Sequence, residues 1–251
     1  MTINKFGLTT VAGAIVLSLA GFVSQAHADP VNATLSATYF EVLNGTGGPD
    51  FGGSGTPNVA PGSALGPDGL PVVSSTSPGI DMVNATTNEI EWWSPGMSSV
   101  VTQTGTGTIS LPYGSNMYPT NSTGSNDSSG FETAMFSGQF SLASSSVVSF
   151  QLGSDDDSFI YVDGILIGQN PGIHGVVNVD FDSGNLAAGN HTIDVFFADR
   201  ERTGAFLSLN LLSSGVTITP GVPEPGSWAL MLAGLGVFGA IARRRKLAQR
   251  G

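Results

Sequence analysis

Alternation of apolar and polar residues dominates the second half of the chain. Apolar side chains recur at every second position, as in a strand with one buried and one solvent-facing side. The segments with this pattern or a short β-rich run are 136–142, 148–152, 159–162, 176–181, 191–197 and 205–212. The turn signals between them are Asp163-Gly164, Asp182-Ser183-Gly184 and Ala188-Gly189-Asn190. Many short strands with regular turns predict an all-β, antiparallel, jelly-roll-like β-sandwich.

The first half of the chain has a weaker pattern. Residues 29–43 are rich in β-formers and predict one strand. Gly, Pro and Ser dominate 44–78, which predicts a long loop, and the polar stretch 102–130 predicts loops with one short strand near 108–111. Trp92 and Trp93 are either a core plug or an exposed platform. We expect a core plug, because a large aromatic side chain stabilises most when buried.

The N-terminus carries the features of a secretory signal peptide. Lys5 precedes an uncharged, largely apolar run at 6–23, and Ala26 and Ala28 form an A-x-A cleavage site. The sequence therefore predicts a signal peptide, with its helix, over 1–28. Because the chain has no cysteine, the exported domain cannot be stabilised by disulfides.

The C-terminus predicts a membrane-spanning helix. The uncharged run 226–242 is at the short end of what crosses a bilayer, and Arg243-Arg244-Arg245 with Lys246 should stay on the cytoplasmic side. By itself this is a plain C-terminal anchor. Together with Pro223-Glu224-Pro225, however, the segment 221–251 closely resembles the PEP-CTERM sorting signal of Gram-negative bacteria.

That resemblance implies a route and a partner. An exosortase would cut near the Pro-Glu-Pro motif after transient anchoring in the inner membrane. The protein would then be secreted or reach the cell surface or extracellular (biofilm) matrix of a Gram-negative bacterium that makes exopolysaccharide.

Removal of both ends leaves a strongly acidic domain. The full chain has 19 acidic and 8 basic residues. Between the two removed segments stand 18 acidic against 2 basic side chains, Arg200 and Arg202, a formal charge of −16. This charge argues against nucleic acid or an anionic membrane as a partner, and it suits divalent cations.

Three consecutive aspartates, Asp155, Asp156 and Asp157, stand out in this domain. Adjacent carboxylates repel one another, so the cluster lies in solvent or a cation neutralises it. Ca²⁺ is the natural candidate, because it takes several oxygen ligands. The sequence thus predicts these residues as calcium ligands, with a solvated acidic turn as the alternative.

Three separate blocks, 153–164, 171–175 and 193–201, resemble the fibro-slime domain. This family is related to the sugar-binding β-sandwich of anthrax protective antigen, and the resemblance implies such a domain over 29–218. In those relatives an adjacent Asp pair, often joined by a cis peptide bond, grips a Ca²⁺ that coordinates sugar hydroxyls. Asp155 and Asp156 match the pair, and Asn170 and His174 are candidate ligand-binding residues of nearby loops. The segment 167–170 departs from the family pattern.

Other residues have plainer interpretations. For His174, a structural hydrogen-bonding role is favoured over a role as ligand or base, and His191 is expected at the surface. Arg200 and Arg202 should pair with Asp199, Glu201 or the aspartate triplet, although one arginine could instead hold a sugar acid. Residues 180–184 are expected to form a hairpin turn and resemble a calcium loop only faintly.

The sequence carries no enzyme signature: no cysteine nucleophile, Gly-x-Ser-x-Gly elbow, metal-binding His pair or phosphate loop. We expect a non-enzymatic, calcium-dependent carbohydrate-binding module that associates with extracellular polysaccharide. The alternatives are a structural matrix protein without a sugar ligand and, less favoured, a glycoside hydrolase, whose carboxylate pair could be distant in sequence.

Overall fold

The computed structural model describes residues 33–43, 45–46, 50–52, 59–74, 79–96, 99–119 and 130–221. The predicted signal peptide, with Ala26 and Ala28, lies outside the described residues. So do Pro223, Glu224, Pro225 and the arginine cluster of the sorting signal. Within the described ranges, no helix has the length and apolar character needed to cross a membrane.

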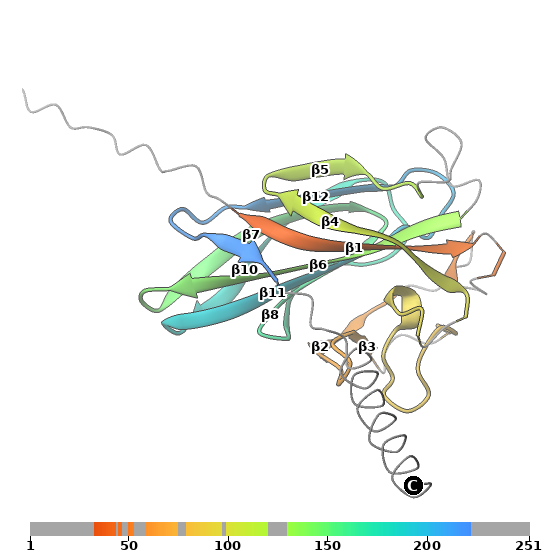
Figure 1. The fold of residues 1–251 in the computed structure, drawn as a ribbon, viewed down its shortest axis with the longest axis horizontal. Helices are drawn as coiled ribbons and strands as arrows, with labels where there is room; N and C mark the ends of the chain where they lie inside the picture. The colour runs from red at the N-terminus through yellow and green to blue at the C-terminus, as the bar shows by residue number, and fades with distance from the viewer. Residues whose placement is uncertain are drawn as a thin grey trace, which may run out of the picture.

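The described chain forms two antiparallel sheets (Figure 1). The large sheet has the order β3-β2-β9-β8-β11-β6-β1-β4, with β13 also paired to β6, and the small sheet has the order β10-β7-β12-β5. The strands are β1 (Thr34–Leu43), β2 (Pro61–Leu65), β3 (Pro71–Val73), β4 (Val101–Ser110), β5 (Tyr113–Asn116), β6 (Gly130–Leu142), β7 (Ser146–Asp155), β8 (Asp157–Val162), β9 (Ile165–Asn170), β10 (Val177–Leu186), β11 (Gly189–Ala198), β12 (Phe206–Leu211) and β13 (Ile218–Pro220), with one 3-10 turn, η2 (Glu91–Trp93). The predicted all-β antiparallel sandwich is confirmed.

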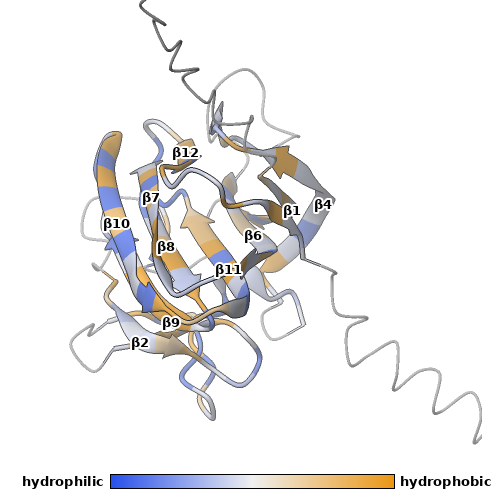
Figure 2. Cartoon of the chain, turned by 90° about the vertical axis from the view of Figure 1, so that its left-hand side faces the viewer, coloured by the Kyte–Doolittle hydropathy of each residue, from blue (hydrophilic) through white to orange (hydrophobic). Residues whose placement is uncertain are grey.

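The core between the two sheets follows from the alternation in the sequence. Hydrophilic and hydrophobic residues alternate along β10, for example (Figure 2). Phe136 of β6, Val195 of β11 and Leu207 of β12 are all almost completely buried in this inner core. The facing sides of the two sheets therefore form this inner core.

A second core covers the opposite face of the large sheet. Buried residues from the described parts of 50–101, including Trp92 and Trp93 of η2, pack on this face (Figure 1). Trp92 and Trp93 are 0% and 2% exposed, which confirms the predicted core plug. The Trp93 ring centroid lies 5.1 Å from that of Phe196 of β11. We call this cluster the outer core.

Strands form in two regions where the sequence predicts loops. β2 and β3 interrupt the expected loop 44–78, and β4 and β5 occupy much of 102–119. β4 is an edge strand that pairs with β1 along its whole length, although only Val101 and Ile109 are buried. Backbone pairing with a distant strand therefore forms β4, which local apolar alternation could not reveal.

The expected turn at Asp182-Ser183-Gly184 is wrong. β10 continues to Leu186, and its register with β7 shifts between Asp182 and Asn185, so the glycine lies in a bulge. The predicted Asp163-Gly164 turn is confirmed between β8 and β9, with φ of 51° and 73°.

The surface position expected for His191 is also wrong, since the residue is 8% exposed. Its Nδ1 lies 2.7 Å from Asp163 Oδ2, and its Nε2 lies 3.0 Å from the Ala187 carbonyl oxygen. The carboxylate of the turn residue thus holds the histidine against the sheet.

Candidate functional site

The three aspartates lie where the chain crosses from one sheet to the other. Asp155 ends β7 in the small sheet, and Asp157 begins β8 in the large sheet. The peptide bond between Asp155 and Asp156 is cis. The exposed fractions of the three residues are only 9%, 1% and 0%, so the triplet is not a solvated acidic turn.

Asp157 is neutralised from within the protein. Its Oδ2 accepts a bond of 2.9 Å from Arg200 Nη1, and both side chains are fully buried. Its Oδ1 accepts a bond of 2.5 Å from the Gly172 backbone N–H. Burial raises the pKa of the Asp157 carboxyl, and the nearby guanidinium opposes that rise. Both oxygens of Asp157 are therefore engaged in holding the fold.

Asp156 is surrounded by backbone donors. Its Oδ1 accepts from the His174 N–H at 3.0 Å, and its Oδ2 accepts from the N–H groups of Arg200 and Glu201, each at 2.8 Å. Burial raises its pKa and these bonds oppose the rise. The carboxyl connects the β7–β8 crossing to two loops, one after β9 and one after β11.

Asp155 differs from its two neighbours. Burial raises its pKa to about 6, and the nearby Asp156 carboxyl adds to the rise. The Asp156 carboxyl is close enough to affect the protonation of Asp155. Gly204 lies directly against the Asp155 carboxyl, so closely that a Cβ at position 204 would overlap Oδ2. Two carboxyls this close need a shared proton or a cation between them.

The structure places the other two predicted ligand-binding residues around the same crossing. Asn170 is 7% exposed, and its Nδ2 donates to Ser154 Oγ at 3.0 Å and to the Val177 carbonyl at 2.9 Å. These bonds join β9 to β7 and β10. His174 Nδ1 lies 2.9 Å from the Gly175 carbonyl, and its Nε2 is buried without a hydrogen-bond partner among the described residues.

Arg200 has a larger role than the sequence indicated. The predicted pairing with the aspartate triplet is confirmed at Asp157, but the guanidinium is also 4.6 Å from the Trp92 ring centroid. Its Nε donates to the Asp50 carbonyl at 2.8 Å. The Asp50 carboxylate in turn accepts from Trp92 Nε1 at 3.0 Å. Asp50 is 150 positions from Arg200, and no local signal in the sequence could have joined the two.

The triplet alone does not make a complete metal cage. Within the described residues, no group of three or more His, Cys, Asp and Glu side chains is placed to hold a metal ion. Asp155 and Asp156 could supply two carboxylates to Ca²⁺, which takes six to eight oxygen ligands. The rest would have to come from backbone carbonyls, water or an external ligand.

Comparison with known proteins identifies the sorting signal. Residues 221–246 match the PEP-CTERM protein-sorting motif, as the sequence predicts. This motif indicates an exported protein. No curated protein matches the chain.

Several solved structures share limited similarity with the chain. They include a PA14 sugar-binding domain from an RTX adhesin, with 17% identity, a TM-score of 0.29, and coverage of 36% of this chain and 51% of that one. The PA14 domain of the MpAFP antifreeze protein has 13% identity and a TM-score of 0.34, over 77% of this chain and 94% of that one. A β-glucosidase from Kluyveromyces marxianus has 14% identity and a TM-score of 0.28, over 34% and 11%. The chain thus spans about half the length of the adhesin domain. Scores this low establish no shared function.

Proposed function

We propose that this chain is an exported, exosortase-processed surface or matrix protein, and that its sandwich binds carbohydrate through a calcium ion held by Asp155 and Asp156. The polysaccharide of the extracellular matrix is the natural ligand in that setting. The residues 29–218 would form the module, and the sorting signal would be removed.

The observation that carries the proposal is a pair of adjacent buried carboxyls, Asp155 and Asp156, that differ in their surroundings. Asp156 is fixed by three backbone N–H groups, whereas Asp155 is 9% exposed and lies beside that carboxyl. Burial is the main cause of the raised pKa of Asp155, and a divalent cation between the carboxyls would remove the repulsion that adds to it. Two carboxylates leave most of the Ca²⁺ shell open, and sugar hydroxyls are suitable oxygen ligands for it.

Calorimetry of the processed protein tests the metal half of this proposal. We expect Ca²⁺ uptake that disappears in Asp155→Asn, because the amide lacks the charge that the ion requires. Asp180→Asn is a matched control, since Asp180 is an exposed carboxylate of β10. Uptake that is equal in all three proteins would contradict a site at Asp155.

Pull-down of the protein on purified exopolysaccharide tests the sugar half. We expect retention in Ca²⁺, release by EDTA and weak retention of Asp155→Asn. Retention that EDTA does not change would reject calcium-dependent binding.

A structural role is the second candidate, and the bonds of Asp156 and Asp157 favour it. Together they connect the β7–β8 crossing to the loops at Gly172, His174 and Arg200. In this case Ca²⁺ would raise the melting temperature while no polysaccharide is retained. That pair of results separates a structural matrix protein from a carbohydrate-binding one.

Removal of the sorting signal is tested in a host that makes an exosortase. Replacing Pro223, Glu224 and Pro225 with alanine should leave the C-terminal segment attached, which mass spectrometry of the membrane fraction would detect. Release of the variant at the normal size would mean that the motif does not direct cleavage.

A further inference from the structure

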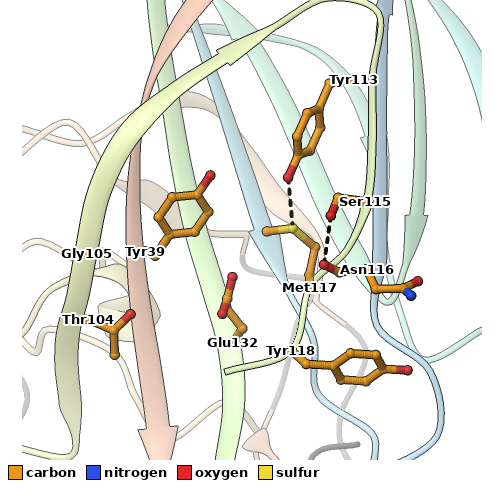
Figure 3. Close-up of a pocket in the computed structure, with 9 residues that line it drawn as sticks. All are labelled: Tyr39, Thr104, Gly105, Tyr113, Ser115, Asn116, Met117, Tyr118 and Glu132. Carbon is orange, nitrogen blue, oxygen red and sulfur yellow. Dashed lines mark hydrogen bonds between the residues drawn. The ribbon is translucent and has the colours of Figure 1, made fainter. Parts of the chain in front are cut away.

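A pocket lies at the open edge of the sandwich, between the two sheets (Figure 3). Its volume is about 230 Å³. We call it the tyrosine pocket. It is defined by Tyr39 of β1, Tyr113 of β5, Glu132 of β6, and Met117 and Tyr118, which follow β5. Thr104 and Gly105 of β4 complete one wall, at the point where the β1–β4 register shifts. Bulges of this kind often lie beside binding sites.

At this pocket, the inner faces of β1 and β6 change from apolar to polar side chains. Ala37 and Phe136 are buried apolar residues of the inner core, whereas Tyr39 and Glu132 follow on the same sides of their strands. Figure 3 shows the hydroxyls of Tyr39 and Tyr113 and the carboxyl of Glu132 directed toward one space, beside Met117. Tyr113 Oη lies 3.5 Å from Met117 Sδ. Apolar walls with a few converging polar groups are typical of small-ligand sites.

Glu132 is a buried polar group of this pocket. It is 5% exposed, and the causes of its raised pKa are burial and the Glu41 carboxyl, with no hydrogen bond among them. Glu41 lies directly opposite it in the β1–β6 pairing and is equally buried. A buried polar group is costly unless it is hydrogen-bonded, so a ligand that bonds to it gains affinity.

We propose that the tyrosine pocket binds a single neutral sugar ring without calcium. The faces of the tyrosine rings offer apolar contact to the C–H groups of the ring, and the converging oxygens bond to its hydroxyls. The volume is small for a ligand site, which limits the occupant to about one ring.

The charge state of Glu132 suits an uncharged ligand. Burial, with Glu41 beside it, raises the pKa of Glu132 to about 8, so the carboxyl is protonated at neutral pH and can both donate and accept a hydrogen bond. The groups around it are Glu41 and Tyr39 of β1, Tyr113 of β5, and Asp199 after β11, whose N–H bonds to the Glu132 carbonyl. None of them is a cation, which disfavours an acidic sugar.

This site is separate from the aspartate triplet, although the two lie at one end of the small sheet. Phe206 of β12 pairs with Asn116 of β5 on one side and with Asp155 of β7 on the other. Two strand spacings, about 10 Å, therefore separate the Asn116 and Asp155 backbones. The failure of one site does not imply the failure of the other.

The test follows the ¹³C-methyl NMR signal of Met117 in the processed protein, in EDTA at pH 7. The probes are methyl glycosides of glucose, galactose and mannose, up to about 50 mM, a range that covers millimolar affinities. We expect at least one of these to shift the Met117 signal in a saturable way. The absence of a shift with all three glycosides would overturn the proposal. Glucosamine, whose amino group carries a positive charge when protonated, is the fourth probe. A shift produced by glucosamine alone would also overturn the proposal, because it would indicate a site for a cationic ligand.

Variants of Glu132 supply the controls. Glu132→Gln keeps a donor and an acceptor and should bind as wild type at pH 7, whereas Glu132→Leu should bind about tenfold more weakly. Wild-type affinity should fall as the pH rises through about 8, where the carboxylate forms, and Glu132→Gln should not follow. Asp155→Asn should leave the Met117 shift unchanged. Equal binding by Glu132→Leu, or its loss in Asp155→Asn, would contradict an independent pocket.

Discussion

At the scale of single residues, one buried arginine organises the aspartate crossing. Arg200 is fully buried, pairs with Asp157, lies against Trp92 and bonds to the Asp50 backbone. It is the cation that allows Asp157 to stay charged inside the protein. Removal of Arg200 would leave the Asp157 carboxylate buried without a compensating cation. This lowers the free energy of unfolding more than replacing both members of the pair with apolar residues.

We therefore expect Arg200→Met to lower the free energy of unfolding by about 3–5 kcal/mol. Arg202→Met, at an exposed cation two positions away, should change it by less than about 0.5 kcal/mol. Guanidinium chloride unfolding measures both. If the double variant Arg200→Met/Asp157→Leu is no more stable than Arg200→Met, the orphaned charge is not the cause of the loss.

The His191–Asp163 pair predicts a pH dependence. Hydrogen bonds to Asp163 and to the Ala187 carbonyl raise the pKa of His191 above its usual 6.5. The stabilisation is therefore complete below pH 6.5 and is lost as the pH rises through the higher folded value. The melting temperature of wild type relative to His191→Gln should fall from pH 6 to pH 8. A difference that stays constant over this range would show that the pair does not bind the extra proton.

At the scale of elements, glycines in strands have opposite roles. A Cβ at Gly107 of the edge strand β4 would meet nothing within 4 Å, whereas a Cβ at Gly168 of β9 would overlap the Phe181 ring of β10. Gly168 thus permits the close approach of the two sheets at this edge. Gly107 makes no such close approach, and as a glycine within a strand it lowers the stability of β4.

The same substitution should then have opposite effects at the two positions. Gly107→Ala should stabilise the protein by about 0.5–1 kcal/mol, because the unfolded chain loses freedom. Gly168→Ala should destabilise it by about 1–3 kcal/mol through overpacking. Thermal melts of the two variants provide the measurement, and equal signs would be inconsistent with the packing described.

At the scale of the whole molecule, the large sheet is shared by two cores. Its inner face packs on the small sheet, and its outer face packs against buried residues from the described parts of 50–101. Phe159 of β8 and Phe196 of β11 belong to the outer core. Val195, the neighbour of Phe196 on β11, belongs to the inner core. Because each central strand serves both cores, the two should unfold together.

Trp93→Ala should therefore destabilise the entire protein by about 3–5 kcal/mol in one cooperative transition. Trp93 Nε1 also donates to the Phe197 carbonyl at 2.8 Å, and this bond would be lost. Circular dichroism of the sheet and fluorescence of Trp92 in the processed protein should give coincident curves. Two separate transitions would mean that the outer segment is an independent unit.

Prediction from the sequence succeeded where structure is local and failed where it depends on distant partners. The alternation in β6 and β7 and the Asp163-Gly164 turn predicted the sandwich. Only the end of β4, near 108–110, was predicted, because the strand's stability comes from pairing with β1, about 65 positions away, and not from its own apolar residues. His191 was placed at the surface for the same reason, since Asp163, its partner, is 28 positions away.

The sequence by itself determined the β class, the sorting signal at 221–246, and the unusual concentration of carboxylates between residues 29 and 220, where there are only two cations. Only the tertiary structure decided what each carboxylate does: Asp157 is neutralised by Arg200, Asp156 by backbone N–H groups, and Asp155 is left beside its neighbour's carboxyl. Periodicity and composition are properties of neighbouring residues and survive in the linear chain. The charge state and availability of a carboxyl depend on burial and on donors brought together from distant segments, which exist only after the chain has folded.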